Sequence, residues 1–366
     1  MKKEIKIKPE VLLTLIKASG YDVEDLAKKT KIPISRINEG LLTLAQLKNV
    51  SEVLKRPIAA FFSDDVPALK TIPDYRLNRE RKLNPEVFLA QRKLEYLIEK
   101  MKELGLKSSS LPSFSQELSA IELAERFRHY LGIDLLKNKK PEEILESYKA
   151  ILEDKLKLII IEQPLKPRKI KNQEISDDVR AFSIYADVSG IVLNETDHPS
   201  IKLFSLFHEV CHLLRKSSGI CSLDYEVEKD FEEESYCNKF AAEFLVPEKD
   251  IKKELKNYLS LQERLTEIID NLAKIYGVSK QVILLRLLHL NFISAQHYYE
   301  IKEQYASKEV KPQFVKRNWS RIYKNRIGDI VIKKVKDSLS KNEISFYEAL
   351  NVLDVKVNYA EKFLYE

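Results

Sequence analysis

One helical segment near the middle of the chain constrains the fold most strongly. Residues 200–216 read SIKLFSLFHEVCHLLRK, and apolar side chains fall on almost every face of the helix that this pattern predicts. A helix of this kind has to lie inside a domain, covered by other elements on most sides. His208 and His212 would then be buried as well, and each imidazole would need a polar partner.

The spacing of the two histidines indicates what that partner is. Residues four apart on a helix project from nearly the same face, so His208 and His212 can direct their imidazole nitrogens at one ion. Glu209 lies beside them, and the arrangement is the His-Glu-x-x-His pattern of zinc hydrolases. The alternative is a pair of buried histidines held only by hydrogen bonds. The apolar helix, the strand expected before it and the acidic helix expected after it favour a Zn²⁺ site.

A catalytic zinc usually has three protein ligands, and the third should come from a nearby helix. In residues 232–247, Glu234, Asn238 and Ala241 lie at i, i+4 and i+7 and share one face. We therefore expect Glu234 to be the third ligand. Other acidic residues of this helix remain alternatives, because spacing alone does not exclude them: Glu232, Glu233 and Glu243.

The rest of the chain predicts a mainly α fold with a small β-sheet. Only 8 of the 366 residues are glycine, and most of the chain has helical periodicity. We expect strands at 156–162 and 181–194, with a hairpin turn at 187–190, and an extended substrate could pair with an edge of the second stretch. Helices are expected near 85–103, 115–131, 141–153, 199–216, 228–245, 261–276, 279–290, 326–339 and 343–352.

Four regions follow from this pattern. An all-α module of short helices with a helix-turn-helix outline occupies 1–70, and a helical connector occupies 71–135. The metal motif lies in a domain expected at 136–260. A helical C-terminal domain at 261–366 includes a basic segment, 305–336, that could contact phosphates or an acidic partner.

Residues 179–247 resemble the ImmA/IrrE family of metallopeptidases. The resemblance rests on Val179-Arg-Ala-Phe-Ser-Ile184, on Ile191-Val-Leu-Asn194, on Leu206-Phe-His-Glu-Val-Cys-His-Leu-Leu214 and on the stretch from Glu234 to Pro247. It implies an α+β zincin-like peptidase domain in which His208, His212 and Glu234 hold zinc and Glu209 is the general base. Cys237 stands where the family pattern has alanine.

The N-terminal module resembles the Xre-type helix-turn-helix regulators that are often fused to this peptidase domain. The resemblance implies binding to double-stranded DNA through the start of a recognition helix and the lysines before it: Lys28, Lys29, Lys31, Ser35 and Arg36. The turn after Glu39 is shorter than in the family. The alternative is therefore a module that contacts protein instead of DNA.

The chemistry implied is hydrolysis of a peptide bond. Zinc would polarise the scissile carbonyl and lower the pKa of water, and Glu209 would accept the water proton and pass it to the leaving amine. Candidates for stabilising the oxyanion are His198, Tyr225 and Tyr236. Cys211, Cys221 and Cys237 cluster around the motif, and we expect them to be small buried hydrophobes rather than a redox switch.

Together these features predict a zinc metallo-endopeptidase and regulator, with conditional activity, that cleaves or controls a repressor or antitoxin-like protein. One alternative is a DNA-binding regulator or antitoxin whose metal site senses or stabilises without turnover, and another is a pure protein-interaction module. The partners that the sequence allows are the protein substrate, double-stranded DNA and a second copy of the chain in a homodimer. We expect no membrane partner and a cytoplasmic location, since the odd cysteine count fits no disulfide framework and no apolar run could span a bilayer.

Overall fold

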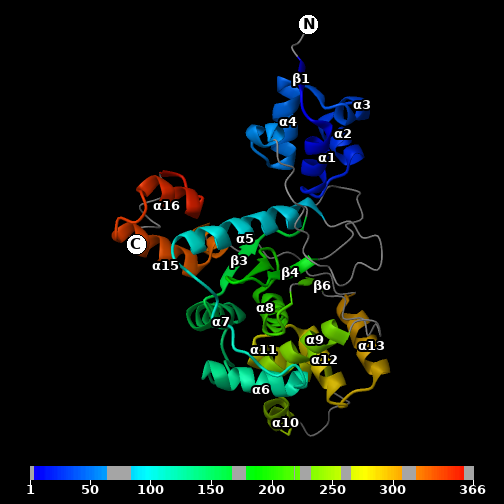
Figure 1. Ribbon diagram of the computed structural model, residues 1–366. Helices are drawn as coiled ribbons and strands as arrows, with labels where there is room; N and C mark the ends of the chain where they lie inside the picture. Colours follow the sequence, from blue (N-terminus) through cyan, green and yellow to red (C-terminus); the bar gives the residue numbers. More distant parts are fainter. Residues whose placement is uncertain are drawn as a thin grey trace.

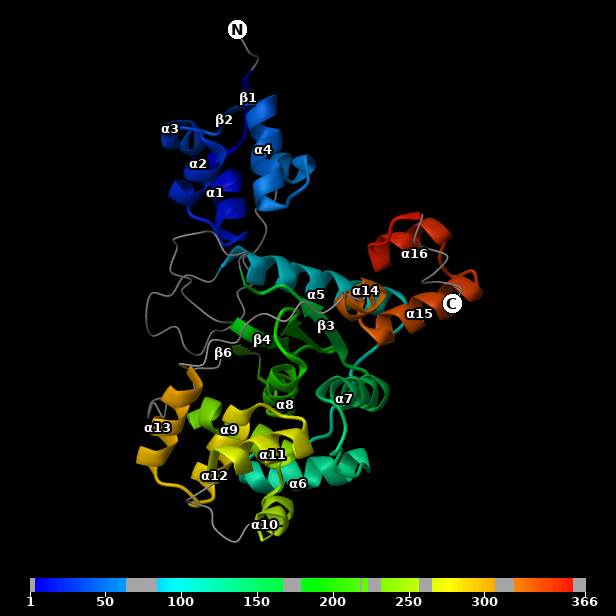
Figure 2. The same cartoon turned by 180° about the vertical axis from the view of Figure 1, so that it is seen from behind.

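The computed structural model describes residues 4–63, 84–166, 179–217, 219–222, 232–256, 265–306 and 319–357, with backbone only at 219–222 and 306. It is mostly helical with two small sheets, which confirms the fold class at that level. The N-terminal module lies at one end of a long helix, α5, and the remaining elements surround a central sheet (Figures 1 and 2).

The N-terminal module has its own hydrophobic core, made by short amphipathic helices. Its elements are β1 (Glu4–Lys6), α1 (Pro9–Lys17), α2 (Val23–Thr30), α3 (Ile34–Asn38), β2 (Leu41–Thr43), α4 (Leu44–Leu54) and the 3₁₀ turn η1 (Ile58–Phe62). The module is not all-α as predicted, because β1 pairs with β2 in an antiparallel ladder.

The short turn after α3 is what brings the two strands together. Gly40 has φ +68°, and a Cβ there would lie 2.1 Å from the carbonyl oxygen of Ile7. The amide of Ile7 also donates to the Gly40 carbonyl at 2.9 Å. Glycine is therefore required, since any side chain would clash with the segment that follows β1.

The central sheet has the strand order β3-β5-β4-β6, with β3 parallel to β5 and the other pairs antiparallel. Its strands are β3 (Ile159–Gln163), β4 (Val179–Ile184), β5 (Gly190–Asn194) and β6 (Gly219–Ser222). The predicted hairpin is confirmed as β4 and β5. The prediction that 181–194 offers an edge to a substrate strand is wrong. Strand β4 lies between β5 and β6, and β5 lies between β3 and β4.

Both faces of this sheet are buried, which explains its nearly continuous apolar strands. Ile159 and Ile161 pack with α5 (Pro85–Glu103) on one face. Ile160 points to the other face, toward α7 (Pro141–Leu156) and α8 (Pro199–Leu214). The motif-bearing helix α8 is therefore held directly against the sheet.

More helices enclose α8 on the side away from the sheet. They are α6 (Ala120–Leu131), α9 (Glu232–Leu245), α10 (Glu248–Leu255), α11 (Leu265–Tyr276), α12 (Lys280–His289) and α13 (Ala295–Ala306). Residues of all six share one hydrophobic core with α8. That core continues past residue 260, where a domain boundary was expected, because the apolar faces of α11 and α12 pack toward it.

The last described helices are α14 (Trp319–Ile327), α15 (Asp329–Ser340) and α16 (Phe346–Leu353). Apolar residues of all three join α5 and the outer face of the sheet in a second core, and Figure 1 shows α15 and α16 near the C-terminal end of α5. The sequence did not predict α10, α13, α14 or the short strands β1, β2 and β6.

The basic segment 305–336 is partly used inside the protein. Arg326 forms a two-point ion pair with Glu195, at 2.5 and 3.0 Å. Arg321 contacts Glu146 at 3.3 Å, and Lys324 contacts Asp329 at 3.1 Å. These described cations neutralise carboxylates of the same chain, so the segment offers less free positive charge than its sequence indicates. Its residues 307–318 lie outside the described part.

Membrane insertion was not expected. Among the described residues, no helix combines the length and the apolar composition that crossing a bilayer requires.

A buried carboxyl on α7 gives the fold a pH dependence. Glu153 is 5% exposed and lies at the N-terminus of α15, where the backbone amides of Asp329 and Ile330 donate to it. Burial, together with the charge of Asp329, raises the pKa of Glu153 from 4.5 to about 8. The folded state therefore favours the protonated acid.

We predict that Glu153→Gln flattens the stability profile between pH 5 and pH 8. Because the folded pKa is raised, the contribution of Glu153 is complete below pH 4.5 and is lost as the pH rises through 8, by at most about 1.4 kcal/mol for each pH unit. Urea unfolding of wild type and variant at several pH values measures this. Glu143→Gln, an exposed site on the same helix, is the matched control. Parallel profiles for wild type and Glu153→Gln would contradict the prediction.

Candidate metal centre

The centre is formed where helices α8 and α9 pack against each other. Proline at N1 and His198 at the N-cap begin α8, and the side chain of His198 accepts the amide of Ser200. The small side chains of Ala241 and Ala242 are fully buried on α9 and allow a close approach. Phe207 of α8 stacks on Phe244 of α9 with ring centroids 4.0 Å apart.

The three predicted ligands meet between these helices. Nε2 of His208 and Nε2 of His212 are 3.2 Å apart. The carboxylate of Glu234 lies 3.2 Å from each of them, with Oε2 toward His208 and Oε1 toward His212. Both histidines are fully buried, and Glu234 is 6% exposed.

These separations fit a tetrahedral metal ion. Zinc binds histidine nitrogen and carboxylate oxygen at about 2.0–2.2 Å, so two ligand atoms of a tetrahedral site lie roughly 3.3 Å apart. Each of the three measured contacts is 3.2 Å. His208, His212 and Glu234 therefore form a group that could hold a metal ion.

Each histidine is oriented by a hydrogen bond at its other ring nitrogen. Nδ1 of His208 lies 2.9 Å from Oδ1 of Asn238, and Nδ1 of His212 lies 3.2 Å from Oγ of Ser217. Asn238 Oδ1 can only accept, so Nδ1 of His208 is the protonated nitrogen and Nε2 has a lone pair for a metal. Asn238 and Ser217 thus fix how the imidazoles face the centre.

Glu209 lies beside the ligands and has a different environment. Its Oε2 accepts a hydrogen bond of 2.6 Å from the hydroxyl of Ser183 on β4. Its Oε1 is buried and has no hydrogen-bond partner among the described residues. Burial raises the pKa of this carboxyl above 4.5, against the lowering effect of His212 and His208. An oxygen in this position can accept a proton from a water molecule or hold that water in place.

The other acidic residues of α9 are directed elsewhere. Glu233 forms an ion pair with Nε of Arg215, at 2.7 and 2.8 Å. Glu243 forms a very short, buried ion pair with Arg286 and also accepts the amide of Glu248. Glu232 is exposed at the start of the helix. Of the four candidates, Glu234 is the one whose carboxylate reaches both histidines.

A second group of ligand types overlaps the first. His212, Glu233 and Cys237 also place ligand atoms within 4.8 Å of one another. Cys237 is fully buried, and burial raises the pKa of its thiol well above 9.0, which disfavours the thiolate that binds metals. Cys211 is likewise a free, buried cysteine, as predicted for a small hydrophobe, and the side chain of Cys221 lies outside the described residues.

The two oxyanion candidates that the structure describes are not directed at the centre. His198 caps the opposite end of α8, ten residues before His208 and thus about 15 Å along the helix axis. The hydroxyl of Tyr236 donates to the carbonyl of Leu118 at 2.7 Å, and its ring lies under the guanidinium of Arg215. Tyr225 lies outside the described residues. The oxyanion role stays a prediction that no described contact supports.

The residues expected to face DNA lie on or beside α2 and α3, and most are exposed. The exposed ones are Lys28, Lys29, Lys31 and Ser35. Arg36 is instead engaged within the module, with a 2.7 Å ion pair to Glu4 and a hydrogen bond to the Leu41 carbonyl. Because α3 has only five residues, it presents a short surface.

Comparison with known proteins agrees with the geometry of this centre. Residues 154–288 match the family model of the IrrE N-terminal-like domain, Peptidase M78. This part of the chain is therefore similar to an IrrE N-terminal-like domain. Searches of curated proteins and of solved structures returned no match. The matched range contains the whole metal centre and extends through most of α12, so this domain includes α11 and α12. The N-terminal module lies outside it.

The sequence predicted the candidate ligands but not the residues that orient them. Ser183 is a fully buried polar residue of β4, within a stretch that carried the family resemblance. Asn238 was placed on the ligand face of α9 by its spacing, which was the available signal for its contact with His208. Nothing in the sequence pointed to Ser217, because its contact depends on how the chain turns after α8.

We predict that zinc content separates the two overlapping ligand groups. Wild type should bind one zinc ion per chain, and His208→Ala and Glu234→Gln should each lose most of it, because each removes a ligand atom of the first group. Glu233→Gln and Cys237→Ala should keep it. Elemental analysis of the dialysed proteins measures this, with circular dichroism to check folding. Loss of zinc from Glu233→Gln and Cys237→Ala, with retention in Glu234→Gln, would assign the metal to the second group.

Proposed function

We propose that the IrrE N-terminal-like domain is a zinc-dependent endopeptidase. The observation that carries this proposal is the buried carboxylate of Glu209 beside three converging ligands, with one oxygen hydrogen-bonded to Ser183 and the other without a hydrogen-bond partner among the described residues. A purely structural zinc site is closed by four ligands and needs no such group. Burying a carboxylate costs free energy unless both oxygens are paired or hydrogen-bonded. A buried carboxylate with one unpartnered oxygen therefore supports a catalytic role.

The residues of the centre have distinct tasks in this reaction. His208, His212 and Glu234 would hold the zinc ion, which would supply Lewis acidity to polarise a carbonyl and lower the pKa of water. Oε1 of Glu209 accepts the proton of the attacking water, and the same carboxyl then returns a proton to the leaving amine. The hydroxyl of Ser183 holds Oε2, so the other oxygen keeps its direction during both transfers.

An extended peptide would bind at an outer strand of the described sheet. With β4 and β5 in its interior, the outer strands are β3 and β6. Of these, β6 follows directly from the turn that ends α8 and contains Ser217, whereas β3 lies beneath α14. A substrate strand that pairs with β6 would place its backbone near the metal ligands.

The substrate proposed is a repressor or antitoxin-like partner protein rather than bulk polypeptide. The support is the position of the peptidase domain in a chain that begins with a separate helical module able to bring it to one target. The competing function is a regulator or antitoxin whose metal centre senses or stabilises without turnover. The environment of Glu209 favours turnover over that alternative.

We predict that Glu209→Gln retains zinc but lowers cleavage by about 10²–10⁴-fold, the range typical for loss of a general base. The amide keeps the shape and the contact with Ser183 but cannot accept a proton. The measurement is cleavage of the protein encoded beside this chain's gene, followed by mass spectrometry, with and without a chelator.

Glu233→Gln is the matched control, since it removes a neighbouring carboxylate that is paired with Arg215. Its cleavage rate should stay near that of wild type. Equal rates for Glu209→Gln and wild type would remove Glu209 as the base. No cleavage by fully zinc-loaded wild type would favour the sensor or structural role.

For the N-terminal module, we propose binding of double-stranded DNA that depends on charge more than on base readout, because Arg36 is engaged by Glu4. Replacing Lys28, Lys29 and Lys31 together by glutamine should weaken binding to the chain's own upstream DNA. It should also reduce the slope of log K against log salt by about 1 for each phosphate that the variant no longer neutralises. Gel retardation at several salt concentrations measures both. An unchanged slope would favour a module that contacts protein.

A further inference from the structure

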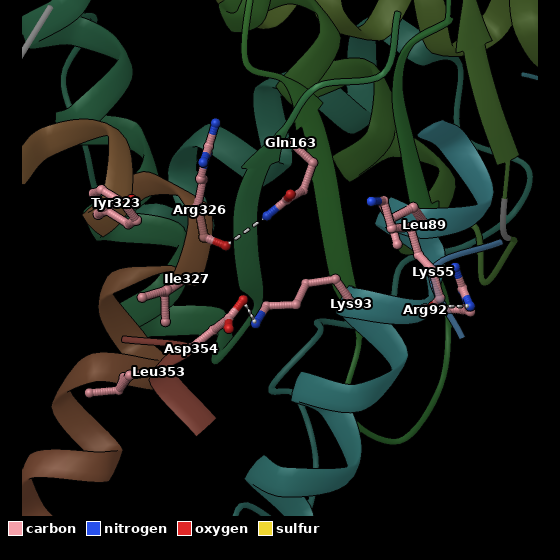
Figure 3. A pocket seen from close by; sticks show the side chains of 10 residues that line it. All are labelled: Lys55, Leu89, Arg92, Lys93, Gln163, Tyr323, Arg326, Ile327, Leu353 and Asp354. Atoms are coloured by element: carbon pink, nitrogen blue, oxygen red, sulfur yellow. Dashed lines mark hydrogen bonds and ion pairs between the residues drawn. The ribbon is translucent and has the colours of Figure 1, made fainter. Parts of the chain in front are cut away.

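A cavity of about 380 Å³ lies far from the metal centre, where three parts of the chain meet. One wall is the end of α4 and the N-terminal half of α5, and the other is α14 with the end of α16 (Figure 3). Strand β3 contributes Gln163, which donates to the carbonyl of Arg326 at 3.0 Å. The volume is within the range of small-molecule sites.

The lining carries an excess of positive charge. Lys55, Arg92, Lys93 and Arg326 line the cavity, and Asp354 is the one acidic residue among its lining. Lys93 lies 3.4 Å from Asp354, and Arg326 is paired with Glu195. Within the described part of the chain, no carboxylate forms an ion pair with Lys55 or Arg92.

Arg92 is the more enclosed of the two cations that form no ion pair among the described residues. Its two terminal nitrogens donate to the neutral carbonyls of Leu54 and Lys55, both at the long distance of 3.3 Å. Its Nε is buried and has no hydrogen-bond partner among the described residues. Burial and the charge of nearby Arg56 lower the pKa of the guanidinium to about 10, against the raising effect of Glu95, so it stays charged at neutral pH. A bound anion would supply a counter-charge and a hydrogen-bond acceptor for the guanidinium of Arg92.

The opposite side of the cavity carries apolar and aromatic side chains beside Asp354 and Arg326, whose guanidinium lies 5.9 Å from the centroid of the Tyr323 ring. Ile327 and Leu353 line it together with the ring of Tyr323, which is 43% exposed. In Figure 3 these three side chains lie across the cavity from Arg92 and Lys55, with Lys93 between the two sides. The cavity therefore has a cationic end and an end suited to a planar, partly apolar group.

We propose that this cavity binds a phosphorylated small molecule of mononucleotide size. Its phosphate contacts Arg92, Lys55 and Lys93, and its base packs against Tyr323, Ile327 and Leu353. A duplex would not reach these groups, because they line a hollow between helices rather than a convex surface. Since the walls belong to the N-terminal module, α5 and the C-terminal helices, the ligand holds the three together.

Calorimetric titration of the full-length protein with AMP, adenosine and inorganic phosphate tests the proposal. AMP should bind with a 1:1 stoichiometry, and adenosine and phosphate should each bind at least tenfold more weakly, because each reaches only one end of the cavity. The same titration on His208→Ala, whose metal site is removed, should give the AMP affinity of wild type. Loss of AMP binding in His208→Ala would place the anion at the metal centre and overturn the proposal.

Two substitutions should change the AMP affinity in opposite directions. Arg92→Gln should weaken it at least tenfold, since it removes a half-buried positive charge from the cavity wall. Asp354→Asn should strengthen it several-fold, because the acidic lining residue becomes neutral and Lys93 is released. Asparagine is well tolerated at residue 354, which caps α16 with φ 54°. Because Asp354→Asn is expected to improve binding, misfolding cannot imitate its effect.

Lys100→Gln is the matched control, since it removes a cation from the same helix outside the cavity lining. Its AMP affinity should equal that of wild type. The proposal is overturned if Arg92→Gln binds AMP as wild type does, if Asp354→Asn binds it more weakly, or if phosphate alone binds as tightly as AMP.

Discussion

The burial of α8 is the constraint on which the rest of the structure depends. A helix that is apolar on nearly every side has to be enclosed, and here the sheet, α7 and α9 enclose it. Enclosure places His208, His212 and Glu209 out of contact with water. Buried polar groups need partners, so the residues that pack around α8 are also those that complete the metal centre. The contacts that bury α8 are therefore also the contacts that position the candidate metal ligands.

Long elements with a strong pattern could be predicted from the sequence, and short elements could not. The periodicity of α5 and α8 gave their positions closely because each helix buries a continuous face. By contrast, β6 has four residues, and its pairing with β4 depends on the turn after α8. Spacing along two helices indicated the candidate ligands, with Glu232, Glu233 and Glu243 left open beside Glu234, but Ser183 comes from a strand 26 residues before Glu209. Contacts of that kind arise from tertiary packing, which leaves little local signal.

The C-terminal helices show why charge counts along the sequence were misleading. Glu162 on β3 is buried between two lysines, with Nζ of Lys202 at 2.6 Å and Nζ of Lys149 at 3.1 Å. The side-chain amide of Asn325 on α14 also donates to it at 3.2 Å. With the Arg326–Glu195 pair, this network holds α14 on the sheet. Residues that read as a free basic surface are thus partly structural.

For the endopeptidase proposed above, the deep burial of the candidate centre would make access, and not ligand assembly, the step that a signal controls. The ligand atoms already lie at coordination distance from one another, and Asn238 and Ser217 fix both imidazoles. An activating signal would therefore not need to rearrange the candidate ligands. It would act on the elements around the site, and α5 is the long helix that packs on the sheet while contacting α4 through Arg92 and α16 through Lys93. A change in how these parts pack would reach the sheet on the face opposite α8. Strand β5 contacts both α5 and α8, and its neighbour β4 bears Ser183, which holds Glu209, so the sheet connects the two sides.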